Sequence, residues 1–154
     1  MHIVVCVKQV PNPEIAPGQY RLDEQARKVA PVAGVQLVMS PFDEQAVEAA
    51  LRIRERHPAA KITVISLGPD TARNAIKHGL AMGADEGVLL NDIAFAGADG
   101  YTTALALAAA IKQIGNVDLV LTGRQAADGD AGVVGAGIGE LLGVAVIAFA
   151  KDVQ

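Results

Sequence analysis

The residues best suited to bind a ligand form the segment 123–135, Gly-Arg-Gln-Ala-Ala-Asp-Gly-Asp-Ala-Gly-Val-Val-Gly, which directly follows a predicted strand, Val117–Thr122. In an open parallel sheet, ligands bind at the carboxyl ends of the strands. Glycines let a ligand approach the backbone closely, and the free N–H groups and dipole of a following helix favour a phosphate. The segment therefore predicts a nucleotide phosphate site. The alternative is a flexible loop before a poorly formed helix.

The common phosphate-binding fingerprints are incomplete in this chain. The stretch 135–139, Gly-Ala-Gly-Ile-Gly, resembles the start of a dinucleotide-binding G-x-G-x-x-G, but residue 140 is Glu and the stretch follows the fourth predicted strand instead of the first. The sequence has no Gly-Lys-Ser/Thr, which excludes a Walker P-loop. Gly129 and Gly132 match the G-x-x-G that opens the ATP loop of universal stress proteins, but Leu142-Gly143 stands where that loop has Gly-Ser/Thr.

Other reactive residue types give weaker signals. Cys6, the single cysteine, lies within a predicted strand, where a thiol usually packs as a small core residue. The pair Asp23-Glu24 predicts solvated charge, and the pair Asp43-Glu44 predicts favourable charge at a helix N-terminus. No pattern marks a nucleophile, and the histidines lack the spacing of metal ligands, so we predict neither a catalytic residue nor a metal site. The histidines are His2, His57 and His78.

Five short β-branched runs bounded by turn residues supply the strands that must position these groups. They alternate with helical patterns, and continuously apolar strands are typical of a parallel sheet with helices on both faces. The prediction is an α/β fold of three layers around a mostly parallel five-stranded sheet. The predicted strands are Ile3–Val7, Ile62–Leu67, Gly87–Leu90, Val117–Thr122 and Val144–Phe149.

Two helices have clear start signals. The first follows Ser40 in a capping-box-like arrangement, has proline at its first position and should end near His57. The second should begin with Asp70 as its cap and end at Gly83.

The remaining segments are less regular. A third helix, about Tyr101–Ile114, is apolar nearly all round, and we expect it to be deeply packed. A fourth follows Asp130 and contains several glycines, each costing ~1 kcal/mol relative to Ala, so something other than helix propensity must favour them. The proline- and glycine-rich region 9–36 predicts an extended excursion with a short hairpin around Gln19–Val29, and such long loops tend to be functional or to cover a partner.

Composition narrows the class of protein. The 154 residues are 51% hydrophobic and 19% charged, which predicts one globular domain over residues 1–154. A net charge of -4 without a Lys/Arg cluster argues against nucleic acid or anionic lipid as a partner. The longest apolar run, Ala104–Ile111, is far shorter than the ~20 residues of a membrane span, and no signal peptide is visible, so we expect no membrane insertion. The single cysteine fits a reducing, cytoplasmic location.

Five segments spread over almost the whole chain occur in the same order in one known family. They are Val5–Pro11, Pro41–Glu48, Leu80–Asp85, Ala94–Asp99 and Gly123–Gly135. On these segments the chain resembles the β subunit of the electron transfer flavoproteins. The Gly-Arg-Gln-Ala-x-Asp-Gly-Asp and Ala-Phe-Ala-Gly-Ala-Asp sequences are more similar to the electron-bifurcating branch than to the mitochondrial type.

The resemblance implies an adenine-nucleotide hydrolase-like (Rossmann-like) sheet with an adenine nucleotide at the carboxyl ends of its strands. In the ordinary branch the nucleotide is a structural AMP, and in the bifurcating branch it is part of an FAD that accepts hydride from NADH. Asp128 and Asp130 would brace the loop, with Asp130 also capping the next helix. Arg124 would lie close to the flavin or, alternatively, pair with Asp128 or Asp130. The implied cofactor-binding residues are Cys6, Ser40, Phe42, Leu67, Gly123, Arg124, Gln125, Ala126, Asp128, Asp130, Gly132, Val133, Val134 and Gly135.

Three features depart from the family pattern. Ser40 stands where the family usually has Asn, and Val133-Val134-Gly135 replaces Gln-Thr-Gly or Gln-Val-Gly, so a side-chain amide is missing from the expected anion site. The third is length, because family members continue for ~100 further residues, a size in keeping with ordinary single domains. We therefore expect a truncated form, a fragment or a divergent stand-alone module without the family's C-terminal region.

The resemblance also implies partners. It predicts one half of a heterodimer with an electron transfer flavoprotein α subunit, supporting electron transfer from NADH or an acyl-CoA dehydrogenase as redox partner. Such a subunit is an electron carrier and is not expected to catalyse a reaction alone. The alternative function is a universal-stress-type module that senses adenine nucleotides. The residues do not decide between AMP and FAD.

Overall fold

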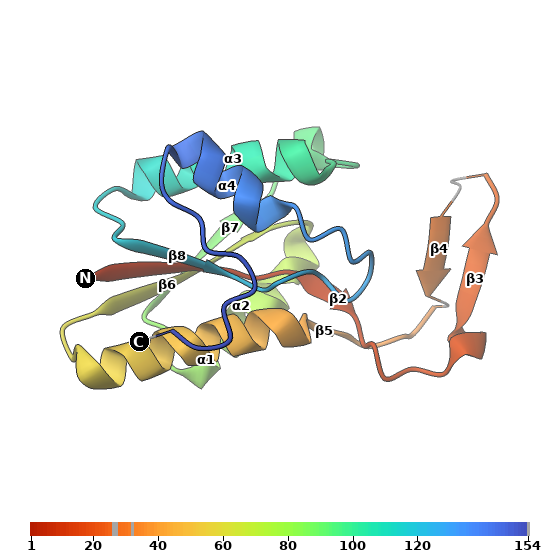
Figure 1. Cartoon of the computed structure of the whole chain (residues 1–154). Helices are drawn as coiled ribbons and strands as arrows, with labels where there is room; N and C mark the ends of the chain where they lie inside the picture. Colours follow the sequence, from red (N-terminus) through yellow and green to blue (C-terminus); the bar gives the residue numbers. More distant parts are fainter. Residues whose placement is uncertain (26–27, 32, 154) are drawn as a thin grey trace.

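The computed structural model describes residues 1–25, 28–31 and 33–153, and its centre is a four-stranded parallel sheet between two layers of helices (Figure 1). The strand order is β7-β6-β1-β8, and each neighbouring pair is parallel. The strands are β1 (His2–Cys6), β6 (Lys61–Leu67), β7 (Glu86–Leu90) and β8 (Leu119–Thr122). The predicted α/β class and mostly parallel sheet are confirmed.

Successive residues of β1 serve different helical layers, which explains its uninterrupted apolar sequence. Ile3 and Val5 pack into the core beside two helices, and Val4 and Cys6 pack into the core beside two others. Successive side chains of a strand point to opposite faces, so in a strand covered on both sides each of these positions is buried and favours an apolar residue. The first layer contains α1 (Pro41–Arg56) and α2 (Arg73–Met82), and the second contains α3 (Gly100–Ile114) and α4 (Val134–Leu142).

The predicted side-chain caps of the first two helices are wrong. Ser40 precedes α1, but its buried hydroxyl has no hydrogen-bond partner among the described residues, and α1 instead starts with backbone bonds to the Ser40 carbonyl. Asp70 opens a short 3-10 turn, η2 (Asp70–Ala72), and its carboxylate accepts a hydrogen bond from Arg73 Nε at 2.7 Å instead of capping α2. The predicted end of α2 at Gly83 is confirmed, with φ 128°.

The third and fourth helices differ in detail from their predictions. One face of α3 is buried, but Tyr101 and Leu105 are exposed, so the helix is not deeply packed all round. Asp130 has a left-handed backbone conformation, with φ 49°, and it lies before α4 begins, because the N-cap position of α4 is Val133. Asp130 therefore does not cap α4. Close packing explains one glycine of α4, because a Cβ at Gly137 would lie 2.9 Å from the Ala104 Cβ of α3.

The predicted fifth strand, Val144–Phe149, is wrong: among the described residues this segment forms no strand. Its apolar residues serve another purpose, since Val146 packs so tightly on Gly139 of α4 that no Cβ would fit there. Phe149 has φ 56°, which interrupts an extended backbone. The tail leads from the α3–α4 layer to the side of α1, where Val153 contacts the core (Figure 1).

The excursion 9–36 contains more structure than predicted. The hairpin is confirmed as β3 (Tyr20–Asp23) paired with β4 (Lys28–Pro31), and it projects from the body in Figure 1. Of the predicted hairpin, residues 26–27 lie outside the described residues. The sequence did not reveal β2 (Gln9–Pro11) and β5 (Leu37–Met39), which pair antiparallel, because each has three residues. Two further 3-10 turns are η1 (Pro17–Gln19) and η3 (Ile93–Phe95).

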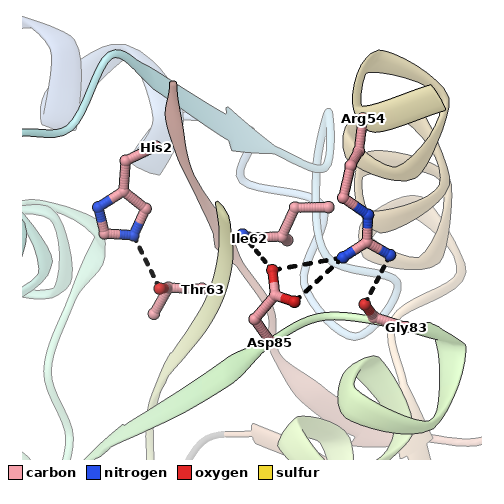
Figure 2. Close-up of polar contacts among 6 residues, drawn as sticks. All are labelled: His2, Arg54, Ile62, Thr63, Gly83 and Asp85. Carbon is pink, nitrogen blue, oxygen red and sulfur yellow. Dashed lines mark hydrogen bonds and ion pairs between the residues drawn. The ribbon is translucent and has the colours of Figure 1, made fainter. Parts of the chain in front are cut away.

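A polar network connects the amino ends of the strands with the end of α1 (Figure 2). Arg54, near the end of α1, contacts the Asp85 carboxylate at 3.2 Å and donates to the Gly83 carbonyl at 2.8 Å. Asp85 also accepts the backbone N–H of Ile62 at 2.7 Å. These contacts join α1 to the amino ends of β6 and β7. At the opposite, carboxyl ends of the strands lies a pocket that gathers residues from three strands.

Candidate functional site

The pocket has a volume of about 390 Å³ and lies at the carboxyl ends of β1, β6 and β8. The start of α3 and the loop between β8 and α4 complete its walls. The volume is within the ~300–1,000 Å³ of typical small-molecule sites, and the position is the usual ligand position in parallel sheets. Its lining from the strand ends and α1 is Cys6, Val7, Lys8, Asp43, Leu67, Gly68, Thr122 and Gly123.

Most of the residues predicted to bind the cofactor meet in this pocket. Those that line it are Cys6, Leu67, Gly123, Arg124, Gln125, Ala126, Asp128, Asp130, Gly132, Val134 and Gly135. Ser40, Phe42 and Val133 do not line it. Ser40 is fully buried, whereas Val133 is exposed and its Cγ2 lies 2.7 Å from the position that a Cβ on Gly100 would take. Ligand binding by the whole set stays a prediction.

Side-chain contacts hold the loop between β8 and α4 in shape. Gln125 accepts from Arg124 Nε at 3.0 Å and donates to Asp130 at 2.8 Å. Lys8, just beyond the end of β1, contacts the Asp128 carboxylate through Nζ at 2.8 Å. Gly132 has φ 64°, a conformation that favours glycine. Asp128 thus connects the loop to the end of β1, and Asp130 connects two parts of the loop with each other.

Arg124 takes a position that the sequence did not predict. Its guanidinium carbon lies 5.5 Å from the centre of the Phe42 ring and 5.7 Å from that of Phe149. These distances are typical of cation–π contacts. The alternative of an ion pair with Asp128 or Asp130 is wrong in this structure: among the described residues the Asp128 carboxylate pairs with Lys8 and that of Asp130 accepts from Gln125.

Asp43 is the most deeply buried carboxylate of the pocket lining. It lies in the first turn of α1, as predicted, but it is only 7% exposed, which the sequence did not indicate. Its Oδ2 accepts the backbone N–H of Lys8 at 2.8 Å. Burial raises the pKa of Asp43 to about 7, although the backbone amides of Lys8 and Gly123 and the Lys8 charge act in the opposite direction. Sequence gave no signal for this burial beyond the position of Asp43 in the first turn of a helix.

Cys6 is buried at the end of β1 beside the same carboxylate. Burial, and secondly the charge of Asp43, raise the pKa of the Cys6 thiol to about 12. A thiol with so high a pKa is a poor nucleophile at neutral pH. Its prediction as a core residue agrees with its contacts, which include the α3–α4 core.

The segment before α3 supplies a wall that site prediction missed. This segment overlaps one of the family-like segments, Ala94–Asp99, but the predicted site does not include it. The residues that line the pocket here are Phe95, Gly97, Ala98, Asp99 and Gly100. The Asp99 carboxylate accepts the Thr102 backbone N–H at 2.7 Å and so caps α3. The Asp-Gly-x-Thr pattern at 99–102 is the signal that could have placed a helix start here.

The arrangement suits a ligand with an apolar ring and an anionic group. Cys6, Leu67 and Leu107 provide apolar surface. Lys8 and Arg124 provide positive charge, beside the carboxylates of Asp43, Asp99, Asp128 and Asp130. The first turn of α4 also reaches the pocket through Val134 and Gly135, and free N–H groups at a helix start attract anions. Among the described residues, no three side chains of metal-binding type cluster.

Comparison with known proteins finds relatives along the whole chain. The sequence model of the electron transfer flavoprotein domain matches residues 29–154. The chain is 41% identical over 154 residues to the caffeyl-CoA reductase-Etf complex subunit CarD of Acetobacterium woodii, covering 100% of this chain and 57% of that protein. It is 44% identical over 154 residues to the electron transfer flavoprotein subunit beta of Thermoanaerobacterium thermosaccharolyticum, covering 100% and 56%.

A further relative is the protein FixA of Azorhizobium caulinodans, 39% identical over 163 residues, covering 99% of this chain and 54% of that protein. The chain thus spans a little more than half the length of the curated relatives it matches. Within the part of the chain that the structure describes, no helix is long and apolar enough to cross a membrane.

Proposed function

The chain belongs to the electron transfer flavoprotein family, and from that premise we propose that it is a β-subunit-like domain that binds an adenine nucleotide, as AMP or as part of FAD. The observation that carries the proposal is the pocket at the carboxyl ends of β1, β6 and β8, which gathers most of the residues that the family resemblance implies. A fold alone would not support a function, but a built site does.

The lining suggests how the nucleotide would be held. The apolar wall of Cys6, Leu67 and Leu107 suits the adenine ring, and the loop from Gly123 to Gly135 suits the ribose and phosphates. The phosphate would take backbone N–H groups at the start of α4, because the amide side chain usual in the family is absent here. If the nucleotide is FAD, its flavin supplies the hydride-accepting and electron-transferring chemistry.

The proposed partners follow from the family. One relative is named as a subunit of a caffeyl-CoA reductase-Etf complex, and others are named as beta subunits. We therefore propose an α subunit as the heterodimer partner and a dehydrogenase as the redox partner, in the cytoplasm. Arg124 lines the pocket and would supply positive charge to the anionic part of a bound cofactor.

The first experiment identifies the ligand. Mass spectrometry of the small molecule released on denaturation should find AMP or FAD, and calorimetry should measure binding of each to the emptied protein. Gly135→Val should abolish binding, because a Cβ at Gly135 would already lie 2.5 Å from Thr122 Oγ1 and the start of α4 would move. Gly18→Val is the matched control, since Gly18 has open space around its Cα and lies outside the pocket.

Two results would contradict the proposal. Unchanged affinity in Gly135→Val would remove the loop from the site. A colourless protein that retains ATP alone would favour the nucleotide-sensing alternative.

A further inference from the structure

The carboxylate of Asp43 lies between the two chain segments that leave the sheet at the pocket. Its Oδ2 accepts the Lys8 N–H, just beyond β1, at 2.8 Å. Gly123, just beyond β8, packs against Oδ1 so closely that a Cβ there would overlap the oxygen, and the Gly123 amide stabilises the charged carboxylate. One side chain of α1 thus connects the end of β1 with the first residue of the glycine-rich loop.

The charged and titratable groups around Asp43 come from several elements. Cys6 of β1 and Lys8 interact with it, and Lys8 Nζ in turn contacts Asp128 of the loop. Further charged side chains line the same pocket, namely Asp99, Arg124 and Asp130. The neighbouring carboxylate, Glu44, lies 3.3 Å from His78 of α2 and does not line the pocket.

We propose that Asp43 is a positioning residue: its ionised carboxylate holds the amides of Lys8 and Gly123 and thereby keeps the glycine-rich loop in the shape that accepts the ligand's phosphate. The inference rests on the proposed function, because it requires a nucleotide in the pocket. An ionised carboxylate only accepts hydrogen bonds, so each oxygen can face one N–H. A protonated carboxyl has an O–H donor on one oxygen, which opposes one of the two amides.

The exchange between these two forms lies in an accessible pH range. Burial raises the pKa of Asp43 to about 7, and the two amides lower it less than burial raises it. The ionised fraction therefore falls from about 0.9 at about pH 8 to about 0.1 at about pH 6. If the ionised form binds the ligand, its apparent affinity should fall up to about tenfold over that range.

The first arm of the test needs no ligand. In isotope-labelled protein, the amide resonances of Lys8 and Gly123 should shift with pH and share a midpoint near 7. Asp43→Asn should abolish this shared transition, and Glu44→Gln, the adjacent carboxylate outside the pocket, should keep it. If Asp43→Asn does not fold, the wild type and Glu44→Gln decide the matter. Amides that do not titrate, or that titrate independently, would overturn the inference.

The second arm measures affinity for FAD against pH by calorimetry. FAD suits the test because its phosphates carry constant charge over this range, so a change in affinity belongs to the protein. Wild type and Glu44→Gln should lose up to about tenfold in affinity toward about pH 6, and Asp43→Asn should bind weakly at every pH with a flat profile.

The results separate the two proposals. Coupled amide titration together with pH-independent FAD affinity would leave Asp43 as a structural contact and overturn its positioning role. Affinity that increases on acidification would overturn it too, since Asp43 would then repel the ligand. If neither FAD nor AMP binds at any pH while the amides titrate together, the nucleotide site itself is wrong.

Discussion

Asp43 and Glu44 show how far neighbouring residues of one type can differ. On a helix, consecutive side chains point about 100° apart, so one can enter a core while the next remains outside. Here Asp43 is buried and lines the pocket, whereas Glu44 contacts His78 at the surface. The sequence shows two adjacent acids in a first helical turn, and it does not show that β1 and the glycine-rich loop converge on the first of them.

The buried carboxylate should make stability fall as pH rises. The pKa of Asp43 is raised from 3.8 to about 7, so between these values the folded chain holds a proton that the unfolded chain has released. Stability is then lost as pH increases through this window, by up to about 4 kcal/mol from this residue. Urea unfolding of wild type and Asp43→Asn at about pH 4.5 and pH 8 measures this loss of stability.

The stability of Asp43→Asn should increase relative to that of wild type from the lower to the higher pH. At both pH values the side-chain amide of this variant leaves one backbone N–H poorly paired. Glu44→Gln serves as the control and should show no comparable gain. A difference between wild type and Asp43→Asn that is the same at both pH values would mean that Asp43 titrates in its ordinary range. A variant that is more stable yet binds ligand less well would mark Asp43 as a residue kept for function.

The site was more predictable where binding uses the backbone than where it uses side chains. The loop 123–135 could be located because several glycines directly after a predicted strand indicate a backbone that a ligand can approach closely. The position of Arg124 between Phe42 and Phe149 could not, because these rings come from α1 and from the tail, far apart in sequence. Contacts of this kind depend on tertiary packing, which local patterns do not encode.

At the scale of elements, apolar patterning predicted the strands of the central sheet and the approximate extent of the helices. The tail did not, since Val144–Phe149 has a strand's composition but packs on α4 and turns at Phe149. Short strands such as β2 and β5 also escaped prediction, because three residues carry too little periodicity. The glycines of α4 were expected to have a reason other than helix propensity, and for Gly137 that reason is the close approach of α3, which the sequence does not show.

The contact between α3 and α4 predicts that Gly137→Ala is destabilising. Alanine gains ~1 kcal/mol in helix propensity over glycine, but its Cβ would lie 2.9 Å from Ala104 Cβ, and overpacking typically costs ~1–3 kcal/mol. We expect a net loss of about 1 kcal/mol in the free energy of unfolding, measured with denaturant. Ala104→Gly should remove the clash, so a double-mutant cycle of the two should show favourable coupling.

Ala136→Gly controls for propensity alone, because Ala136 is the exposed neighbour on the same helix. It should lose about 1 kcal/mol without coupling to residue 104. Were Gly137→Ala to stabilise the protein, the approach of the two helices would be looser than this structure has it.

At the scale of the whole molecule, the tail and the adjoining sheet edge leave apolar groups in solvent. Val144, Val146, Ile147 and Phe149 are all exposed within six residues. β8 is an edge strand whose residues are only half buried. Exposed apolar surface and open strand edges both favour association with another protein surface. This feature fits a chain that functions with a partner, and it predicts self-association when the chain is alone.

Ile147 offers the sharpest test because it is 86% exposed, so Ile147→Ser should change folding stability little. Burying an isoleucine side chain is worth ~1.5–3 kcal/mol, so losing even part of that contact should weaken self-association about tenfold. Light scattering over a concentration series measures the effect. Ile93→Ser is the matched control, since Ile93 is 88% exposed but lies in η3, outside the tail. Equal effects of both substitutions, or a wild type that stays monomeric throughout, would show that the tail is not the associating surface.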